Sequence, residues 1–309
     1  MARIVVIGSI NTDMVVRSSQ IPGPGQTLMG HSFMTTGGGK GANQAVAAAR
    51  LGADVSLIAK VGTDTFGKMA IENFKKEKIS TENIYIDSLA PSGVAFIVVD
   101  DKGENIIIVA PGANSTLNEK DIQDAEVLIG NADIILFQLE IPMTTVAEGV
   151  RLAKKHNRLV MLNPAPATQI PEEILPLIDI ITPNQTEALM LTGFAVNDTS
   201  TAQNACDVLH GKGILTVIIT MGEQGAYISS KNYKGLVPGF NAGVTVDTVA
   251  AGDTFCGGLA IAIAEGKSLQ DAVQFANAAA ALSVTKPGAQ DSIPTRAEVE
   301  TLLKCASHM

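Results

Sequence analysis

The sequence predicts an α/β fold in three layers, in which helices cover both faces of a mainly parallel sheet, with a small antiparallel β-sheet added at one side. Two observations lead to this prediction. Apolar runs rich in Val and Ile alternate with longer helical patterns along most of the chain, and strand-like runs follow one another directly in two places. Because no repeat, low-complexity segment or long linker divides the 309 residues, we expect a single α/β domain spanning residues 1–309.

The predicted strands of the main sheet are short apolar runs without polar alternation, which is typical of strands buried on both faces. They occupy residues 4–10, 55–61, 134–139, 159–163, 178–182 and 214–220. Helical patterns fill residues 40–51, 65–76, 143–156, 199–210, 251–265, 269–285 and 295–304. This alternation of strand and helix predicts that most of the strands run parallel.

Two pairs of strand-like segments break the alternation, residues 14–16 with 27–36 and residues 94–99 with 105–109. The turn sequence Asp101-Lys102-Gly103 predicts that the second pair is a hairpin. In the chain, the two pairs lie on either side of a main-sheet strand, so we expect them to combine into the small antiparallel sheet. The discontinuous segments 13–36 and 93–110 would then form a lid over the functional site.

Composition excludes several classes of protein. The chain has 22 Lys and Arg against 31 Asp and Glu, and its net charge of −9 repels a phosphate backbone, so we expect no nucleic-acid partner. Its 3 cysteines lie in no Cys-x-x-Cys pair, which fits a reducing compartment. No apolar stretch reaches the ~20 residues that span a bilayer, and the first residues lack the pattern of a secretory signal. We therefore expect a cytoplasmic protein with no membrane partner.

The densest glycine cluster is Gly37-Gly38-Gly39-Lys40-Gly41-Ala42-Asn43, which leads directly into an Ala-rich helix. Glycines here let the backbone approach a ligand closely. The cluster is not a P-loop, because Gly41 follows Lys40 where Ser or Thr would stand, and its partial dinucleotide fingerprint lacks a preceding core strand. Lys40 and Asn43 offer donors suited to sugar oxygens. A glycine-rich helix entry without a ligand is the simpler alternative.

Polar residues also follow two predicted strands. Asn11 and Asp13 come after the first strand and would point to one face of an extended backbone, where an amide and a carboxylate can hold neighbouring hydroxyls. A polar turn is the alternative. Glu140 follows the apolar run 134–137, close to the carboxyl end of a predicted core strand, where open α/β sheets bind ligands. By itself, Glu140 could equally be a solvated loop residue.

Two further segments have the chemistry of a nucleotide site. Asn184 and Glu187 share one face at a helix start, where they could approach Mg²⁺ and phosphates, although the spacing is also that of a capping box. The run Thr220-Met221-Gly222-Glu223-Gln224-Gly225 turns at the end of a strand. A nucleotide could lie along this turn, and an ordinary hairpin into residues 226–229 is the alternative.

The segment Asp247-Thr248-Val249-Ala250-Ala251-Gly252-Asp253-Thr254 places an acid at the start of a long apolar helix. Free N–H groups and the macrodipole at a helix N-terminus attract anions. The N–H groups of Ala250, Ala251 and Gly252 could stabilise a transferring phosphoryl group while Asp253 accepts the proton of the attacking hydroxyl. The alternative is that Asp253 is only the N-cap of the helix.

In chain order, these segments closely resemble the ribokinase-like carbohydrate kinases. The likeness runs from Ile7-Gly8-Ser9-Ile10-Asn11-Thr12-Asp13 to Gly288-Ala289-Gln290. Two signatures carry it, Gly38-Gly39-Lys40-Gly41-Ala42-Asn43-Gln44-Ala45 and Asp247-Thr248-Val249-Ala250-Ala251-Gly252-Asp253-Thr254-Phe255. The resemblance implies ATP-dependent phosphorylation of a small furanose sugar, D-ribose at its 5-hydroxyl, to give ribose 5-phosphate.

The resemblance also implies a role for each matching residue. The sugar would be held by Asn11, Asp13, Gly38, Gly39, Lys40, Gly41, Asn43 and Glu140, with Asp253 as catalytic base. ATP would lie against Asn184, Thr220, Met221, Gly222, Glu223, Gln224, Gly225, Gly252 and Asn277, with Glu187 organising Mg²⁺ and water. A K⁺ ion would be contacted by Asp247, Val249, Ser283, Lys286, Gly288 and Ser292. Members of this family tend to form homodimers through their lid sheets, which implies a homodimer here.

Three alternatives remain open from the sequence. A kinase of the same family could act on another sugar or on a nucleoside. A sugar-binding regulatory protein could use the same fold without catalysis, and a dinucleotide-dependent oxidoreductase could use the glycine cluster. Hydrolase and zinc chemistry lack support, because no His-x-x-x-His pair and no Gly-x-Ser-x-Gly turn occurs.

Overall fold

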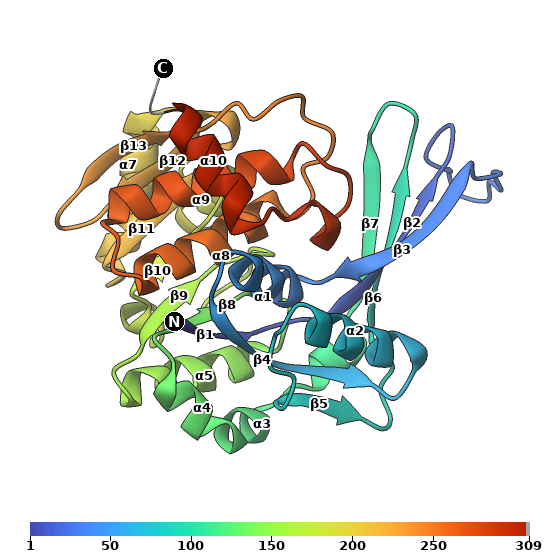
Figure 1. Cartoon of the computed structure of the whole chain (residues 1–309), viewed down its shortest axis with the longest axis horizontal. Coiled ribbons are helices and arrows are strands. Elements are labelled where there is room, and N and C mark those ends of the chain that lie inside the picture. The colour runs from blue at the N-terminus through green and yellow to red at the C-terminus, as the bar shows by residue number, and fades with distance from the viewer. Residues whose placement is uncertain (307–309) are drawn as a thin grey trace.

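A computed structural model describes residues 1–306 and contains two β-sheets (Figure 1). The main sheet has nine strands in the order β13-β12-β11-β10-β9-β8-β1-β4-β5. Their bounds are β1 Arg3–Ile7, β4 Asp54–Gly62, β5 Ile84–Asp87, β8 Ile134–Phe137, β9 Leu159–Leu162, β10 Ile180–Ile181, β11 Thr216–Thr220, β12 Gly225–Ser229 and β13 Lys234–Pro238. All neighbouring pairs from β5 to β11 are parallel, whereas β12 and β13 add an antiparallel edge.

The main sheet separates two hydrophobic clusters. Alternate residues of β1 enter opposite clusters, Ile4 and Val6 on one face and Val5 and Ile7 on the other. The helices divide in the same way. Those on the first face are α1 Lys40–Arg50, α2 Thr65–Lys76, α8 Ala251–Ala264, α9 Leu269–Ser283 and α10 Arg296–Ala306. Those on the second face are α3 Glu119–Asp124, α4 Glu126–Asn131, α5 Met143–Lys155, α6 Gln185–Thr192 and α7 Thr199–Gly211. The predicted three-layer fold is confirmed.

The first predicted strand, residues 4–10, is shorter than expected. β1 ends at Ile7, and the chain then turns into a new strand at Asn11. Helix α1 packs closely against this turn. A Cβ on Gly41 would lie only 2.5 Å from the backbone nitrogen of Ser9, so this close approach requires glycine at position 41. Asn11 and Asp13 therefore belong to a strand and not to a loop.

The small sheet consists of β2 Asn11–Arg17, β3 Ser32–Gly38, β6 Gly93–Val99 and β7 Asn105–Ala110, in the order β3-β2-β6-β7. We predicted an antiparallel sheet, but its central pair is parallel, with Asn11 opposite Gly93 and Arg17 opposite Val99. The reason is that both strands start at the main body and run outward (Figure 1). The strand predicted over residues 27–36 is also displaced, because residues 18–31 contain no strand.

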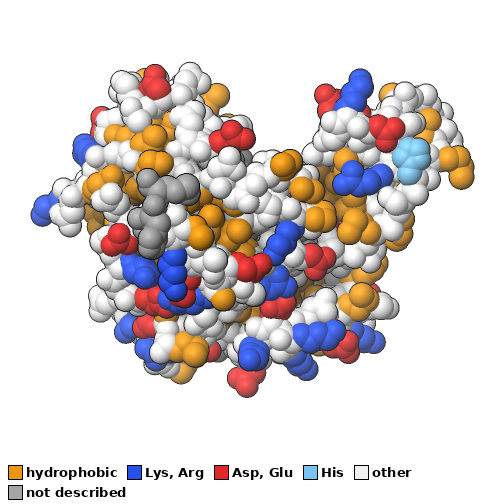
Figure 2. Space-filling view, turned by 45° about the horizontal axis from the view of Figure 1, so that its top comes forward, with side chains coloured by type: hydrophobic (Ala, Val, Ile, Leu, Met, Phe, Trp, Pro, Cys, Tyr) orange, Lys and Arg blue, Asp and Glu red, His pale blue; other side chains and the backbone are white. Residues whose placement is uncertain are grey.

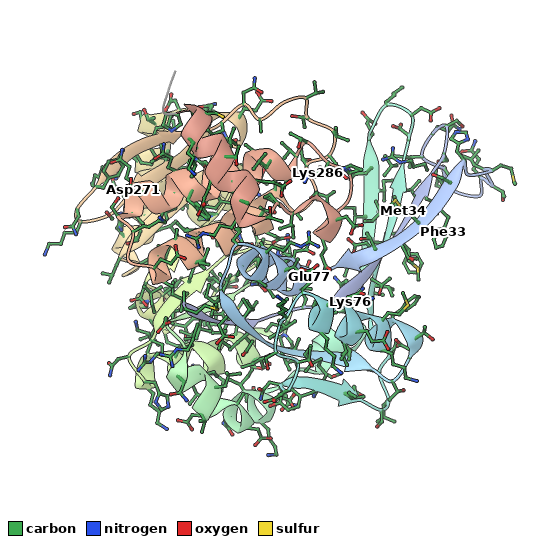
Figure 3. All side chains as sticks on the ribbon, in the orientation of Figure 1. Phe33, Met34, Lys76, Glu77, Asp271 and Lys286 are labelled. Carbon is green, nitrogen blue, oxygen red and sulfur yellow. The ribbon has the colours of Figure 1, made fainter. Side chains whose placement is uncertain are left out.

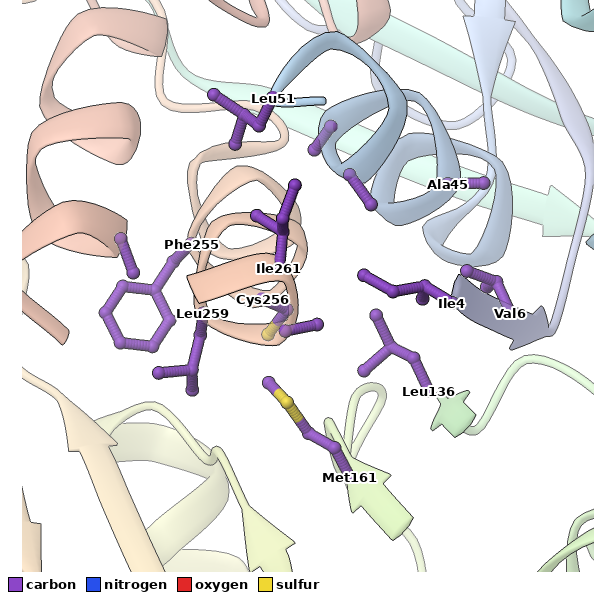
Figure 4. Close-up of a cluster of buried hydrophobic side chains, with 14 of the residues drawn as sticks. Ile4, Val6, Ala45, Leu51, Leu136, Met161, Phe255, Cys256, Leu259 and Ile261 are labelled. Carbon is purple, nitrogen blue, oxygen red and sulfur yellow. The ribbon is translucent and has the colours of Figure 1, made fainter. Parts of the chain in front are cut away.

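Helix α8 packs between α1 and α9 on the first face of the main sheet. Figure 4 shows its side chains Cys256, Leu259 and Ile261 among Leu51, which follows α1, and Met161 of β9. Burial on almost every side explains why its sequence is apolar without a polar stripe. The helix thus holds its first turn in a fixed position relative to the carboxyl edge of the main sheet. Over residues 1–306, no helix is long and apolar enough to cross a membrane.

Candidate active site

A cavity of about 190 Å³ lies at the carboxyl edge of the main sheet, beside the first turn of α8. Its lining includes Lys40, Asn184, Glu187, Thr220, Gly252 and Asp253, which come from both halves of the chain. Carboxyl edges of parallel sheets are where open α/β folds bind ligands. A larger cavity of about 290 Å³ near Ile170, Leu175 and Met190 is lined mainly by aliphatic side chains, so the polar chemistry lies in the smaller one.

Asp253 is anchored in this cavity at both of its carboxylate oxygens. It is buried, and each of its carboxylate oxygens accepts one hydrogen bond, Oδ2 from Asn43 Nδ2 at 2.9 Å and Oδ1 from Gln44 Nε2 at 2.9 Å. The alternative that Asp253 caps its helix is wrong. The N-cap of α8 is Ala250, and no side chain caps this helix.

The first turn of α8 offers main-chain donors. Among residues 1–306, the N–H groups of Ala250 and Gly252 have no hydrogen-bond partner, whereas the N–H of Ala251 donates to the Thr248 carbonyl at 3.3 Å. Ala250 has a φ of 60°, a conformation that costs about 1–2 kcal/mol for a residue with a side chain. A Cβ on Gly252 would meet open space, so this turn faces room for a ligand. Strained backbone and free donors together suit an anion site.

Asp13 and Glu140 are not among the residues that line this cavity, but the charges of Glu140 and Asp253 both act on Asp13, which belongs to the small sheet. Burial raises the pKa of Asp13 to about 7, and the charges of Glu140 and Asp253 add to this while Lys40 opposes it. Asp13 stands directly over Gly38, where a methyl group would overlap its carboxylate. The sequence therefore needs glycine at 38 to bring the glycine cluster against β2.

Glu140 connects three segments of the site. Its Oε2 accepts from Ser9 Oγ at 2.5 Å and from the Lys40 backbone N–H at 3.0 Å. Burial alone would lower the pKa of the Lys40 ammonium, but the nearby carboxylates of Asp253, Glu140 and Glu187 more than offset burial and raise it. Lys40 therefore remains a cation between two groups of acids.

Hydrogen bonds define which atoms of the Asn11 and Asn43 amides remain free to bind a ligand. Asn114 bonds both backbone groups of Ile10, accepting from its N–H at 2.8 Å and donating to its carbonyl at 2.9 Å. Asn114 Nδ2 also donates to Asn11 Oδ1 at 2.8 Å, so Asn11 Nδ2 remains to donate to a ligand. Asn43 Oδ1 is buried and has no partner within residues 1–306, so it can accept from a ligand hydroxyl.

Asn184 and Glu187 form the capping box of α6, as one sequence alternative predicted. Asn184 Oδ1 accepts from the Glu187 N–H at 2.8 Å, and Glu187 accepts from the Asn184 N–H at 2.8 Å and from Asn184 Nδ2 at 3.1 Å. Both residues also line the cavity. Burial raises the pKa of Glu187, with the charge of Asp253 adding and the hydrogen bond from Asn184 and the charge of Lys40 opposing.

The turn at residues 220–225 joins β11 to β12 in an antiparallel hairpin. Thr220 reaches the cavity, while the Met221 side chain is buried in the hydrophobic cluster on the second face. Asn277 has a structural task, since its Nδ2 donates to the carbonyls of Val237 and Pro238 at 3.0 and 3.1 Å. Glu223 and Gln224 form a short exposed 3₁₀ turn between Gly222 and Gly225.

The residues expected around K⁺ are also brought together in part. Asp247 Oδ1 accepts from the Val249 N–H at 3.0 Å and Oδ2 accepts from the Gly288 N–H at 3.0 Å. Ser283 and Ser292 donate their hydroxyls to carbonyls three residues earlier, and the lone pairs of these hydroxyl oxygens remain available to a cation. Lys286 points to Glu298, with which it forms an ion pair at 2.8 Å. Within residues 1–306, no cluster of three His, Cys, Asp or Glu side chains could hold a metal ion.

Comparison with known proteins identifies the family. The model of the pfkB family of carbohydrate kinases matches residues 1–296. The chain belongs to this family.

The relatives of this carbohydrate kinase include ribokinases and a deoxyribokinase. The chain is 48% identical to the ribokinase of Haemophilus influenzae, over 98% of its own length and 99% of that protein. It is 37% identical to the deoxyribokinase of Salmonella typhi, over 94% and 95% of the two chains. The structure of Arabidopsis thaliana ribokinase complexed with ribose and ATP superposes with a TM-score of 0.91 at 33% identity, covering 98% and 99%.

The structure of this carbohydrate kinase adds residues that sequence reasoning missed. Gln44 and Asn163 contact one another beside Asp253, and Asn114 orients Asn11. Ser9 supports Glu140. Gln44 lies within the glycine signature and Asn163 at the end of a predicted strand, so a search for polar residues at strand ends could have found Asn163. No local pattern marks Asn114.

Proposed function

We propose that the chain transfers the γ-phosphoryl group of ATP to the 5-hydroxyl of D-ribose, giving ribose 5-phosphate and ADP. One observation carries the proposal. Asp253 lies buried beside the free N–H groups of an uncapped helix N-terminus and lines the polar cavity, close enough to Asp13 for its charge to raise the pKa of that residue. A base and an anion site are the two parts that phosphoryl transfer to an alcohol requires.

The reaction needs one proton acceptor. The 5-hydroxyl oxygen forms the new bond to the γ-phosphorus, the bond from that phosphorus to the bridging oxygen breaks, and ADP leaves with the electron pair. The hydroxyl proton passes to Asp253. Charge on the transferring group is stabilised by the N–H groups of Ala250 and Gly252 and by the Lys40 ammonium. Since Ala251 N–H donates to Thr248, Ala251 serves the anion hole by shaping the turn.

The sugar fits the polar groups on the other side of Asp253. Asn11 donates, Asp13, Glu140 and Asn43 Oδ1 accept, and this alternation suits a ring that carries several hydroxyls. The backbone at Gly38, Gly39 and Gly41 lets the glycine cluster lie close to the ring, because side chains there would collide with Asp13, Asn11 or Ser9. Buried groups of fixed polarity discriminate strongly against a sugar that lacks a matching hydroxyl.

ATP would approach from the side of Asn184, Thr220 and Gly252, with its base toward the turn at 220–225 and the Asn277 region. Mg²⁺ would be bound by the phosphates and by water held by Glu187, since both oxygens of Glu187 already accept from Asn184. The metal supplies charge neutralisation between the phosphates. Within residues 1–306, no group of three His, Cys, Asp or Glu side chains could hold the metal by itself, so we propose that Mg²⁺ binds as a complex with ATP.

We propose that a K⁺ ion orders the loop before α8. Asp247 already connects residue 249 to Gly288, so the two loops that would surround the ion are in place. Carbonyl oxygens and one carboxylate are hard donors suited to an alkali cation. Lys286 is an unsuitable ligand through its side chain, which is paired with Glu298.

The small sheet would act as a lid and as a dimer contact. Its arm projects beyond a hollow in the surface and carries hydrophobic side chains (Figure 2). Strand register places one set of apolar residues on the face away from Asn11 and Asp13, namely Met14, Val16, Phe33, Phe96, Val98, Ile106 and Ile108. Phe33, labelled in Figure 3, is 63% exposed and Ile108 is 65% exposed. Pairing this face with the same face of a second copy would bury it.

A deoxyribose kinase is the second candidate, because the Salmonella typhi relative named above is a deoxyribokinase. The deciding experiment measures ADP release with ATP and a panel of ribose, 2-deoxyribose, fructose and a nucleoside, with and without K⁺. We expect ribose to have the highest kcat/KM, with K⁺ raising turnover and the product phosphorylated at carbon 5. A higher kcat/KM for another acceptor would overturn the assignment of ribose. Since the reaction consumes ATP, we place the enzyme in the cytoplasm.

A further inference from the structure

A network of amide side chains holds Asp253, and only part of this network lines the cavity. Gln44 Nε2 donates to Asp253 Oδ1 at 2.9 Å and to Asn163 Oδ1 at 3.1 Å. Gln44 Oε1 accepts from Gln138 Nε2 at 2.6 Å. Asn163 Nδ2 in turn donates to the Thr182 carbonyl at 3.0 Å. This amide network therefore connects the first turn of α8 to the carboxyl ends of β8, β9 and β10. The connection passes through Gln44, which belongs to α1.

The polarity of Gln44 follows from its partners. A carboxylate and an amide oxygen only accept, so the group facing Asp253 and Asn163 must be the amide nitrogen. The oxygen then faces Gln138, whose own nitrogen must be the donor. Gln44 and Gln138 are fully buried, and the amide of Gln44 already uses both of its hydrogens on Asp253 and Asn163 and its oxygen on Gln138, so Gln44 has no group left to donate to a ligand. Any effect of Gln44 on the reaction must pass through another residue.

We infer that Gln44 is a positioning residue that fixes the carboxylate of Asp253 against the attacking hydroxyl. Asn43 holds Oδ2 and Gln44 holds Oδ1, so the carboxylate plane is defined at two points. Without Gln44, the carboxylate keeps one anchor and can rotate about its side-chain bonds. A displacement of about 1 Å at a reacting group can cost on the order of 10²-fold in rate. The inference rests on the proposed function, since it needs Asp253 as base.

The test is a double-mutant cycle. Gln44→Leu removes the amide at similar volume, and we expect kcat to fall about 10²-fold while KM for ribose and for ATP changes less than about threefold. Because Gln44 acts through Asp253, adding Gln44→Leu to Asp253→Asn should lower the residual turnover no further. Unchanged kcat in Gln44→Leu, a loss confined to KM, or losses that add in the double variant would overturn the inference.

Two further variants keep the test decisive if Gln44→Leu unfolds. Gln138→Leu removes only the donor to Gln44 Oε1, and we expect a kcat loss of about 3–10-fold, near the rate equivalent of one buried hydrogen bond, that disappears in the Asp253→Asn background. Thr145→Val is the matched control, because it removes a buried hydrogen bond to the Leu117 carbonyl and neither residue lines the cavity. It should reduce thermal stability and leave kcat unchanged. If Asp253→Asn retains turnover, Asp253 is not the base and the proposed function is contradicted. If Asp253→Asn loses turnover but Gln44→Leu retains it, only the positioning role of Gln44 is contradicted.

Discussion

Asn114 Nδ2 donates to Asn11 Oδ1 at 2.8 Å, across 103 residues of sequence. Because the Asn114 amide bonds both the N–H and the carbonyl of Ile10, it cannot flip, and it leaves Asn11 Nδ2 as the free donor of the Asn11 side chain. Asn114, which is only 1% exposed, thereby determines which atom of Asn11 is free to bind substrate.

Asn114→Asp should weaken sugar binding. A carboxylate cannot donate to the Ile10 carbonyl or to Asn11, and an unsatisfied buried acceptor costs about 1–3 kcal/mol. We expect KM for ribose to rise about tenfold, with a smaller change in kcat, as measured by ribose-dependent ADP release. Asn118→Asp is the control, since that exposed side chain only caps α3 and its substitution should leave KM unchanged. Unaltered KM in Asn114→Asp would show that Asn11 polarity does not matter.

Gly38→Ala should disable the sugar side of the site. The added methyl group would overlap the Asp13 carboxylate, so the Asp13 side chain must leave its position or the backbone must move. We expect ribose affinity, measured by calorimetry, to fall at least about tenfold, the usual effect of removing one polar interaction from a buried site. Gly211→Ala offers a matched control, because a methyl group there meets nothing within 4 Å. Equal ribose affinity in both variants would contradict the close approach at Gly38.

The raised pKa of Asp13, about 7, predicts a pH dependence of stability. The native state holds this proton between about pH 4 and pH 7 while the unfolded state does not, so the free energy of unfolding falls as pH rises through that window. Asp13→Asn removes the titration. The stability of the natural chain relative to this variant should therefore decline with pH, by at most about 1.4 kcal/mol for each unit. Urea unfolding at several pH values measures it, and a pH-independent difference would contradict the burial of an uncompensated carboxyl.

Ile108→Lys should convert a dimer into a monomer. The charge would lie on the apolar face of the small sheet, on its edge strand β7 and opposite Phe96, where burial against a second copy leaves it unpaired. Light scattering after gel filtration should show half the mass of the natural chain. Val127→Lys, at a position 78% exposed on α4, should leave the mass unchanged. A natural chain that is already monomeric would contradict the dimer contact.

Local patterns predicted the layers and most helices. α2 begins and ends as expected because Asp64 caps it, its side chain accepting from the Gly67 N–H, a signal readable in the sequence. α3 and α4 were missed, since six residues each are too few for a helical periodicity to emerge. The small sheet was expected to be antiparallel because hairpins are the local default, whereas its parallel central pair depends on a crossover through the main body.

The same limit applies to the site. Asp253 and the glycine cluster stand out in the sequence because each combines chemistry with a helix start. Gln138 and Asn114 do not, since their importance comes from contacts with residues about 100 positions away. Glycine at 93 shows the same dependence, because a methyl group there would overlap Asn11 and Asn114. These requirements for a particular residue become visible only in the folded structure, where the strands lie side by side.

The turnover of Asp253→Asn tests the central claim most directly. With ribose, ATP, Mg²⁺ and K⁺ present, we predict that kcat falls by about 10²–10⁴-fold, the usual contribution of a general base, while calorimetry still detects ATP and ribose binding. Turnover within a few-fold of the natural chain would contradict the account, because the Asp253 carboxylate, held by Asn43 and Gln44 in the first turn of α8, is the proposed proton acceptor of the reaction.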